Sequence, residues 1–202
     1  MKTDPRNPLF PLIEKHELIL ASGSPRRREL LSMLELPFTV DTSHSVDESY
    51  PASLPPEEIP AYLSLVKAAA LDLKPDDRRL VITADTVVIL GDEVLGKPAD
   101  DAEARDMLCR MAGRLQKVVT GVTIVTPARS ATFSEMTMVE FAPLTDEEIR
   151  YYVDTFHPLD KAGAYGIQEW IGAAAIRRID GSFYNVMGLP IHRLYTQLKK
   201  FL

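Results

Sequence analysis

The chain has 202 residues, of which 46% are hydrophobic and 26% are charged. These ordinary values exclude disordered, low-complexity and collagen-like chains, and the length suits one domain or two small lobes around a shared core. The formal net charge of −6 argues against a protein whose main task is to grip nucleic-acid backbone. The single cysteine, Cys109, requires no oxidising compartment. Because the sequence also lacks a signal-peptide pattern and a membrane-spanning run, we expect a cytoplasmic protein.

The first predicted elements are a short strand and the helix that follows it. A Pro-rich N-terminal extension over residues 1–17 leads into an apolar strand within residues 16–22. A turn of small residues over 22–24 ends that strand. Ser24 is a favoured N-cap and Pro25 a favoured first helical residue, so we expect a helix to begin there.

The middle of the chain is predicted to carry a helix, a buried strand and a second helix. Residues 41–57 are polar and Pro-rich, and the apolar spacing after them predicts a helix over 57–73. Residues 80–90 are rich in β-branched side chains, which is typical of a central strand, and a hairpin turn leads from them into 93–95. A capping pattern then predicts a helix over 100–113.

Strands and helices continue to alternate toward the C-terminus. Two strands are predicted over 115–126 and 131–141, followed by a helix that Thr145 and Glu148 cap. The remaining expected elements are a glycine-bearing loop over 157–172, a strand over 174–179 and a closing helix over 189–202. This order predicts an α/β chain with an antiparallel component.

The turn that opens the first helix is the first candidate site. Arg26, Arg27 and Arg28 lie in the first helical turn, where the helix dipole disfavours cations. A bound phosphate or polyphosphate would engage both the helix N-terminus and the arginines. A solvent-exposed basic turn accounts for the same residues equally well, so both interpretations stay open at this point. The pattern of a P-loop is absent.

Asp85 is the second candidate because it is the one acid in the strand over 80–90. A carboxylate among apolar and β-branched neighbours costs free energy unless it is paired, bound to a metal or placed at a cleft. The structural alternative is an aspartate at a strand end or bulge that neighbouring N–H groups satisfy. The density of apolar neighbours favours a functional role.

The segment over 160–168 is the third candidate. It combines small residues with a charge pair, an aromatic ring and an amide, a mixture that suits a pocket for a nucleobase. On the residues alone, a surface loop is the better interpretation. Lys67 and Lys97 are likewise residues of a type found more often on surfaces than in sites, although Lys97 directly follows the predicted hairpin.

Metal chemistry is predicted to rest on carboxylates. The four histidines lack the close spacing of zinc ligands, and no H-E-x-x-H, G-x-S-x-G or C-x-x-C pattern occurs. Asp47, Glu48 and Asp85 offer hard oxygen ligands suited to Mg²⁺ or Mn²⁺.

Five segments together carry a family resemblance: LASGSPRR at 20–27, ADTVV at 84–88, GKP at 96–98, TGV at 120–122 and DKAGAYGIQ at 160–168. In this order and spacing they resemble the Maf family of nucleoside triphosphate pyrophosphatases, over about residues 18–202. The resemblance implies a Maf/ITPase-like α/β fold with a single mixed, twisted sheet flanked by helices, and two lobes around a central cleft. The DKAGAYGIQ form is similar to the branch of the family that acts on dTTP and UTP.

The resemblance also assigns roles to residues. Asp85 matches the family's proton acceptor, which would orient and deprotonate the water that attacks the α-phosphorus. Residues at positions linked to substrate choice are Arg26, Thr86 and Gln168. Candidates for phosphate binding are Ser22, Ser24, Arg27, Lys67 and Lys97. A divalent cation, Mg²⁺ or Mn²⁺, is implied, with Asp85 and Glu48 as candidate ligands. Asp47 and Glu48 fall where the family carries an acidic pair.

The expected partners follow from the same resemblance. They are a nucleoside triphosphate substrate and a second copy of the chain in a homodimer. The net charge and the lack of a membrane-spanning run add the expectation of no nucleic acid and no membrane. A nucleotide-binding regulator of cell division without essential catalysis remains the alternative hypothesis, and release of pyrophosphate would distinguish the two. A nucleic-acid binder that uses the arginine turn is the weakest hypothesis, because the sequence offers no second basic patch.

Overall fold

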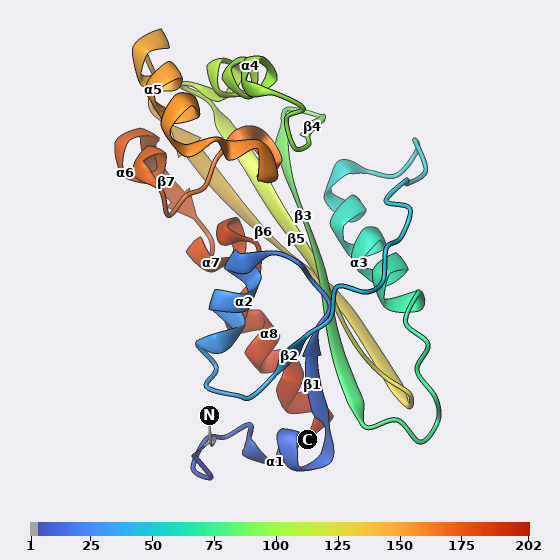
Figure 1. The fold of residues 1–202 in the computed structure, drawn as a ribbon. Helices are drawn as coiled ribbons and strands as arrows, with labels where there is room; N and C mark the ends of the chain where they lie inside the picture. Colours follow the sequence, from blue (N-terminus) through green and yellow to red (C-terminus); the bar gives the residue numbers. More distant parts are fainter. Residues whose placement is uncertain (1–3) are drawn as a thin grey trace. The chain divides into compact units, whose positions relative to one another are not determined.

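The computed structural model describes residues 4–202 (Figure 1). In chain order its elements are α1 (Phe10–Lys15), β1 (Glu17–Leu20), α2 (Pro25–Ser32), β2 (Thr39–Val40), η1 (Pro56–Glu58), α3 (Ile59–Ala69), β3 (Arg79–Leu90), β4 (Glu93–Leu95), α4 (Asp101–Met111), β5 (Leu115–Thr126), β6 (Arg129–Phe141), α5 (Asp146–Phe156), η2 (Pro158–Asp160), η3 (Ala162–Ala164), α6 (Trp170–Ala175), β7 (Ile176–Asp180), α7 (Phe183–Met187), α8 (Ile191–Leu198) and η4 (Lys199–Phe201).

The strands within residues 4–202 form one mixed sheet of seven strands in the order β2-β1-β3-β5-β6-β7, with β4 paired to β3. β1 runs parallel to both β2 and β3, whereas β4 is antiparallel to β3 and β7 is antiparallel to β6. The prediction of a single mixed sheet flanked by helices is therefore confirmed. No helix within residues 4–202 has the length and apolarity needed to cross a membrane.

The chain divides into two compact units, in agreement with the predicted two lobes. The first unit contains the residues up to Asp85 together with Thr120–Glu135 and Gly188–Leu202, and the second contains Thr86–Val119 and Met136–Met187. The boundary falls inside β3, directly after Asp85.

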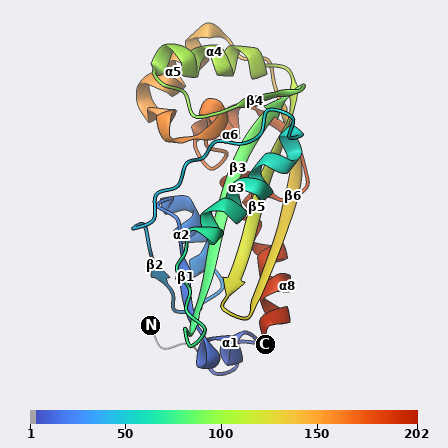
Figure 2. The ribbon, with the colours of Figure 1, turned by 90° about the vertical axis from the view of Figure 1, so that its right-hand side faces the viewer.

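In the first unit, helices cover both faces of the sheet. α2 and α8 lie against one face, and α3 lies against the other (Figures 1 and 2). Each of these helices buries an apolar side: Leu30 and Leu31 on α2, Ile59, Pro60 and Leu63 on α3, and Ile191, Leu194 and Leu198 on α8. Coverage of both faces explains why β3 reads as an almost continuous apolar run rather than as an alternating one.

α3 approaches the sheet at Gly121 of β5. A Cβ atom at this position would lie 2.2 Å from the backbone carbonyl carbon of Pro60 and 2.2 Å from the backbone nitrogen of Ala61. Only glycine permits backbone to approach backbone this closely. The glycine of the TGV segment therefore sets how near α3 lies to the strand.

The second unit packs α4 and α5 together, and both helices begin as predicted. The Asp100 side chain accepts a hydrogen bond from the Glu103 backbone N–H, and Thr145 and Glu148 form a full capping box. An ion pair of 2.6 Å joins Arg105 on α4 to Asp154 on α5. Buried residues of the unit include Tyr152, Phe141 and Leu108.

Several boundaries differ from the predictions. Ala174 and Ala175 belong to α6, and β7 begins only at Ile176, because the alanine run favours a helical turn before the β-branched residue. α1 and α7 are short helices that the sequence pattern did not predict. The closing helix begins at Ile191 rather than at residue 189 and ends in a 3-10 turn. The helix predicted over 57–73 is η1 followed by α3, which ends at Ala69.

Candidate active site

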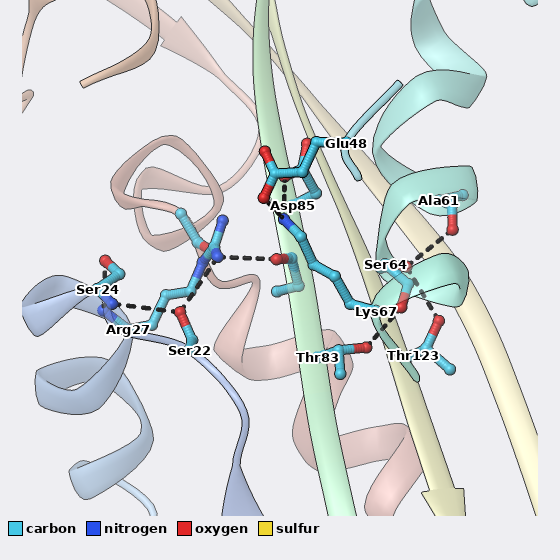
Figure 3. Close-up of polar contacts among 12 residues, drawn as sticks. Ser22, Ser24, Arg27, Glu48, Ala61, Ser64, Lys67, Thr83, Asp85 and Thr123 are labelled. Carbon is cyan, nitrogen blue, oxygen red and sulfur yellow. Dashed lines mark hydrogen bonds and ion pairs between the residues drawn. The ribbon is translucent and has the colours of Figure 1, made fainter. Parts of the chain in front are cut away.

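β3 carries the acid at the centre of the candidate site. All of its residues are buried except Arg79, Asp85 and Thr86, which are partly exposed, and the Asp85 side chain is 14% exposed. The prediction that Asp85 lies within a largely buried strand is confirmed. Side chains two residues apart on a strand point to the same face, so Asp85 shares the face of Thr83, which lies toward α3 (Figure 3).

Lys67 of α3 neutralises Asp85. Its Nζ lies 2.6 Å from Asp85 Oδ1 and 3.0 Å from Glu48 Oε1, so one ammonium group joins two carboxylates (Figure 3). The Lys67 side chain is 18% exposed, whereas that of Glu48 is 57% exposed. The pairing gives the Asp85 carboxylate the counter-charge that a largely buried charged group requires.

The turn before α2 forms as the sequence predicts. The Ser24 side chain caps the helix and accepts from the Arg27 backbone N–H at 3.5 Å, with Pro25 as the first helical residue. Ser22 Oγ accepts from the Ser24 backbone N–H at 3.3 Å. The two serines predicted to bind phosphate therefore order the N-terminus of α2, and direct phosphate contacts by their hydroxyls stay a prediction.

Arg27 connects three parts of the first unit. Its Nε donates to the Gly188 carbonyl at 2.9 Å, and its Nη1 donates to the Ala84 carbonyl at 2.8 Å and to Ser22 Oγ at 3.3 Å. Burial lowers the pKa of the Arg27 guanidinium, and the negative charge of Asp85 opposes that shift. Arg27 is thus a charged residue that holds the backbone next to Asp85.

Arg27 donates to the Ala84 carbonyl because β1 ends before it reaches this part of β3. β1 ends at Leu20, and directly after it the Ala21 backbone N–H donates to the Ile82 carbonyl at 2.9 Å. The next carbonyl on the same edge of β3 is that of Ala84, two residues further on. Arg27 supplies a donor at the point where the neighbouring strand stops. In Figure 3 it reaches β3 from the side of α2, while Lys67 reaches it from the side of α3.

Only one member of the acidic pair contacts the cluster. Glu48 binds Lys67, whereas the exposed Asp47 accepts from the backbone N–H of Ser49 at 2.9 Å and from its Oγ at 3.0 Å, in a local turn. The structure therefore places Glu48 beside Lys67 and Asp47 in a separate local turn.

The donor set fits a divalent cation that arrives with a polyphosphate. Mg²⁺ is usually held by one or two carboxylates together with substrate phosphates, and Asp85 and Glu48 both lie against Lys67 Nζ. Within residues 4–202 no cluster of three or more His, Cys, Asp and Glu side chains is placed to hold a metal ion on its own. Substrate oxygens would have to complete such a site.

Three predicted residues belong to the second unit. Thr86 directly follows Asp85 on β3 and is partly buried, Lys97 is exposed after β4, and Gln168 is exposed at the end of the DKAGAYGIQ segment. Arg26, in the first unit, is partly buried. The roles in substrate choice and phosphate binding that the resemblance gives these residues stay predictions.

The DKAGAYGIQ segment is a buried, internally bonded structure rather than a loose surface loop. The Tyr152 hydroxyl of α5 donates to Glu169 Oε2 and accepts from the Gly166 backbone N–H at 3.0 Å. Lys161 Nζ lies 2.8 Å from Asp160 Oδ1 and 3.1 Å from Glu169 Oε1. These contacts to Tyr152 and Glu169 hold the segment in place, and Gln168 at its end is exposed.

Sequence reasoning missed the groups that hold these residues in place. Tyr152 and Glu169 lie outside any motif that was singled out, although Glu169 directly follows the DKAGAYGIQ segment. Ser64 and Thr83 were also missed. Their signal was spacing, because Ser64 lies three residues before Lys67 on a helix and Thr83 lies two residues before Asp85 on a strand.

The sequence is similar to those of known proteins over nearly its whole length. The family model described as Maf-like protein matches residues 17–201. A dTTP/UTP pyrophosphatase from Phocaeicola vulgatus is 51% identical over 190 residues, which cover 93% of this chain and 97% of that protein. Relatives of the same name from Porphyromonas gingivalis, at 51% identity over 94% of this chain and 96% of that protein, and from Bacteroides thetaiotaomicron, at 50% identity over 93% and 97%, give the same result. Among solved structures, a HAM1 protein from Coxiella burnetii matches at a TM-score of 0.40 and 18% identity over 64% of this chain and 74% of that one.

Proposed function

The chain belongs to the Maf family, and on that premise we propose that it hydrolyses dTTP and UTP to the nucleoside monophosphate and pyrophosphate. The proposal takes its substrates from the names of relatives that are about half identical over nearly the whole chain. The structural observation that carries it is the ion pair of 2.6 Å between Lys67 and Asp85, beside a strand backbone that Arg27 holds.

Asp85 is the proposed general base. Its carboxylate would accept a proton from a water molecule whose oxygen attacks the α-phosphorus. The bond between that phosphorus and the oxygen bridging the α- and β-phosphates breaks, and the bridging oxygen leaves with pyrophosphate. Lys67 supports this step because it fixes the carboxylate in place and offers an ammonium group to the phosphate charge.

Charge neutralisation would supply much of the remaining catalysis, as in other phosphoryl transfers. The proposed phosphate-binding groups are Lys67, Arg27, Lys97 and the turn that contains Ser22 and Ser24. A divalent cation, Mg²⁺ or Mn²⁺, would be held by Asp85 and Glu48 and, when bound, would neutralise phosphate charge. Asp85 acting mainly as a metal ligand is the alternative assignment of the same carboxylate.

Substrate choice is proposed to rest on Arg26, Thr86 and Gln168. The Gln168 amide offers one donor and one acceptor, which is the pattern needed to pair with one edge of uracil or thymine. Its exposed position at the end of an internally bonded segment supports a role in recognition.

The test is release of pyrophosphate from a panel of nucleoside triphosphates with Mg²⁺ or Mn²⁺, for wild type, Asp85→Asn and Asp47→Asn. We expect turnover of dTTP and UTP by wild type, a fall in kcat of about 10²–10⁴-fold for Asp85→Asn, and little change for the exposed control Asp47→Asn. If nucleotides bind and none is cleaved, the chain is a nucleotide-binding regulator instead. If Asp85→Asn keeps its rate, another group is the base.

The cytoplasm and a homodimeric state complete the proposal. The cytoplasm suits an enzyme that acts on free nucleoside triphosphates and a chain whose one cysteine forms no disulfide. The homodimer is taken from the family resemblance. Sedimentation equilibrium over a range of protein concentrations would give the mass of the assembly, and a monomer at all concentrations would refute the dimer.

A further inference from the structure

Two contacts between α3 and β3 stand next to each other in the first unit. Thr83 Oγ1 donates to the Ser64 carbonyl at 2.7 Å, and Lys67 Nζ donates to Asp85 Oδ1 at 2.6 Å. Ser64 and Lys67 share one side of the helix, and Thr83 and Asp85 share one face of the strand (Figure 3). The first contact is uncharged and buried, and the second is the centre of the candidate active site.

The buried contact continues into a chain of hydroxyl groups. Ser64 Oγ donates to the Ala61 carbonyl at 2.8 Å and lies 2.9 Å from Thr123 Oγ1, which lies 2.9 Å from Thr132 Oγ1. A hydroxyl has one proton to donate, so with Ser64 engaged at Ala61, Thr123 must donate to Ser64, and Thr132 must donate to Thr123. The chain therefore has one direction, from β6 through β5 to α3.

These hydroxyls are costly to misplace. The side chains of Ser64, Thr83 and Thr123 have no solvent exposure, so any shift of α3 that broke their bonds would leave buried polar groups unsatisfied. Gly121 marks the limit of movement toward the sheet, because the backbone of α3 already lies so close to β5 there that a Cβ would not fit. The buried hydrogen bonds thus oppose movement of α3 away from the strands, and the contact at Gly121 opposes movement toward them.

We propose that Thr83 and Ser64 are positioning residues that set Lys67 against Asp85. The inference rests on the proposed function, in which this pair holds the reacting groups. Lysine reaches its target through a flexible four-carbon stem, so the ion pair by itself does not fix the helix. The Thr83–Ser64 contact, one turn away, anchors the start of that stem, and displacements of about 1 Å in an active site can cost about 100-fold in rate.

The decisive variants are Thr83→Val, which keeps the shape and removes the hydroxyl, and Thr83→Ser, which keeps the hydroxyl. We expect Thr83→Val to lower kcat for dTTP by about 10- to 100-fold with a smaller change in KM, and Thr83→Ser to restore at least half of the wild-type kcat. Ser64→Ala, which cuts the link to Thr123, should lower kcat in the same direction. It also serves as the second variant if Thr83→Val does not fold.

Thr126→Val is the matched control. Thr126 is buried on β5, donates to the Arg129 carbonyl at 3.2 Å and accepts from the Arg129 backbone N–H at 3.1 Å, in the turn that joins β5 to β6. The Thr126→Val variant should show a fall in Tm similar to that of Thr83→Val, but its kcat should stay at the wild-type value. Equal effects of Thr83→Val and Thr126→Val on kcat would reduce Thr83 to a structural role and overturn the proposal.

A double-mutant cycle asks whether Thr83 acts through Lys67. If it does, Thr83→Val should change kcat little when Lys67→Met is already present, because there is no ammonium group left to misplace. Additive losses in the double variant would overturn the proposal. The ratio of rates is measured at a temperature well below the Tm of every variant, so that unfolding does not enter it.

A readout without turnover separates this inference from the proposed function. Acylation of Lys67 by an amine reagent, followed by peptide mass spectrometry, measures how well the ammonium group is held. Thr83→Val should raise the labelling rate at Lys67 at least threefold, whereas Thr83→Ser and Thr126→Val should not. If wild type cleaves no triphosphate, the proposed function fails, and the labelling still decides whether Thr83 positions Lys67. Unchanged labelling overturns the positioning role.

Discussion

Arg27 Nη1 donates to the carbonyl oxygen of Ala84 at 2.8 Å, one residue before the acid at the centre of the candidate site. The same guanidinium also holds the Gly188 carbonyl through Nε at 2.9 Å. A side chain from α2 therefore ties the strand that carries Asp85 to the residue at the start of the C-terminal segment of the first unit. The planar guanidinium donates in fixed directions to these two carbonyls and to Ser22 Oγ, a geometry that a single ammonium group does not reproduce.

Arg27→Lys should consequently cost more stability and activity than the same substitution at a neighbouring arginine. We expect a loss of roughly 1.5–3 kcal/mol in the free energy of unfolding, as for a hydrogen bond to a charged group, and a kcat lower by at least tenfold. Urea unfolding and initial rates on dTTP measure the two effects. Arg28→Lys, at an exposed position of the same helix, is the control, and a matching loss there would show that Arg27 is not special.

Gly121→Ala tests the approach of α3 to β5. The added Cβ would meet the Pro60 backbone at 2.2 Å, so the helix must move away from the sheet. We expect a destabilisation of about 3 kcal/mol or more, at the upper end for overpacked sites, read from Tm and urea unfolding. At Gly96 a Cβ meets nothing within 4 Å, so Gly96→Ala should leave stability nearly unchanged. A stable Gly121→Ala protein would contradict the packing described here.

Local patterns predicted the parts of the fold that depend on neighbours in sequence. The Ser24 cap, the capping box of α5 and the buried run around Asp85 were all read correctly, because each is set within a few residues. Local patterns could not predict the ion pair between Glu48 and Lys67, because it depends on how the irregular segment that carries Glu48 passes α3. α6 was missed because six residues with a mixed pattern carry little signal.

Glu48→Gln tests the proposed metal site. Removal of its charge should raise the Mg²⁺ or Mn²⁺ concentration needed for half-maximal activity by about tenfold, the lower end of what loss of a metal-site group costs, with a smaller effect at saturating metal. Excess EDTA should abolish turnover of the wild type. Asp47→Asn is the control, because Asp47 only closes its own turn. An unchanged metal requirement in Glu48→Gln would remove this residue from the site.

Tyr152→Phe tests how the DKAGAYGIQ segment is held. The change removes the hydroxyl that donates to Glu169 and accepts from the Gly166 backbone N–H, two partners in a largely buried place. We expect a loss of about 1–3 kcal/mol of stability and a higher KM for UTP. Tyr151→Phe is the control, since that ring is exposed and packs edge-on against Trp170. Equal stability of both variants would contradict the role of the buried hydroxyl.

The same residue gives a pH dependence with a defined sign. Burial raises the pKa of Tyr152 above the usual tyrosine value of 10.0, and the hydrogen bond to Glu169 adds to the shift. Above that pH the unfolded chain has lost a phenolic proton that the folded chain retains, so stability falls as pH rises. Between pH 9 and about 11, the Tm of wild type should therefore fall more steeply than that of Tyr152→Phe. Parallel curves would show that the phenol stays unshifted.

Gln168→Glu tests recognition of the base. The substitution keeps the shape of the side chain but replaces the amide donor with a second acceptor, so the pattern that matches uracil or thymine is lost. We expect kcat/KM for dTTP and UTP to fall by about 10- to 100-fold, the cost of one or two unmade hydrogen bonds, while inhibition by inorganic tripolyphosphate changes less than threefold. The tripolyphosphate measurement controls for the added negative charge. If both quantities fall together, the side chain acts through charge on the phosphates, and recognition of the pyrimidine must be assigned to other residues.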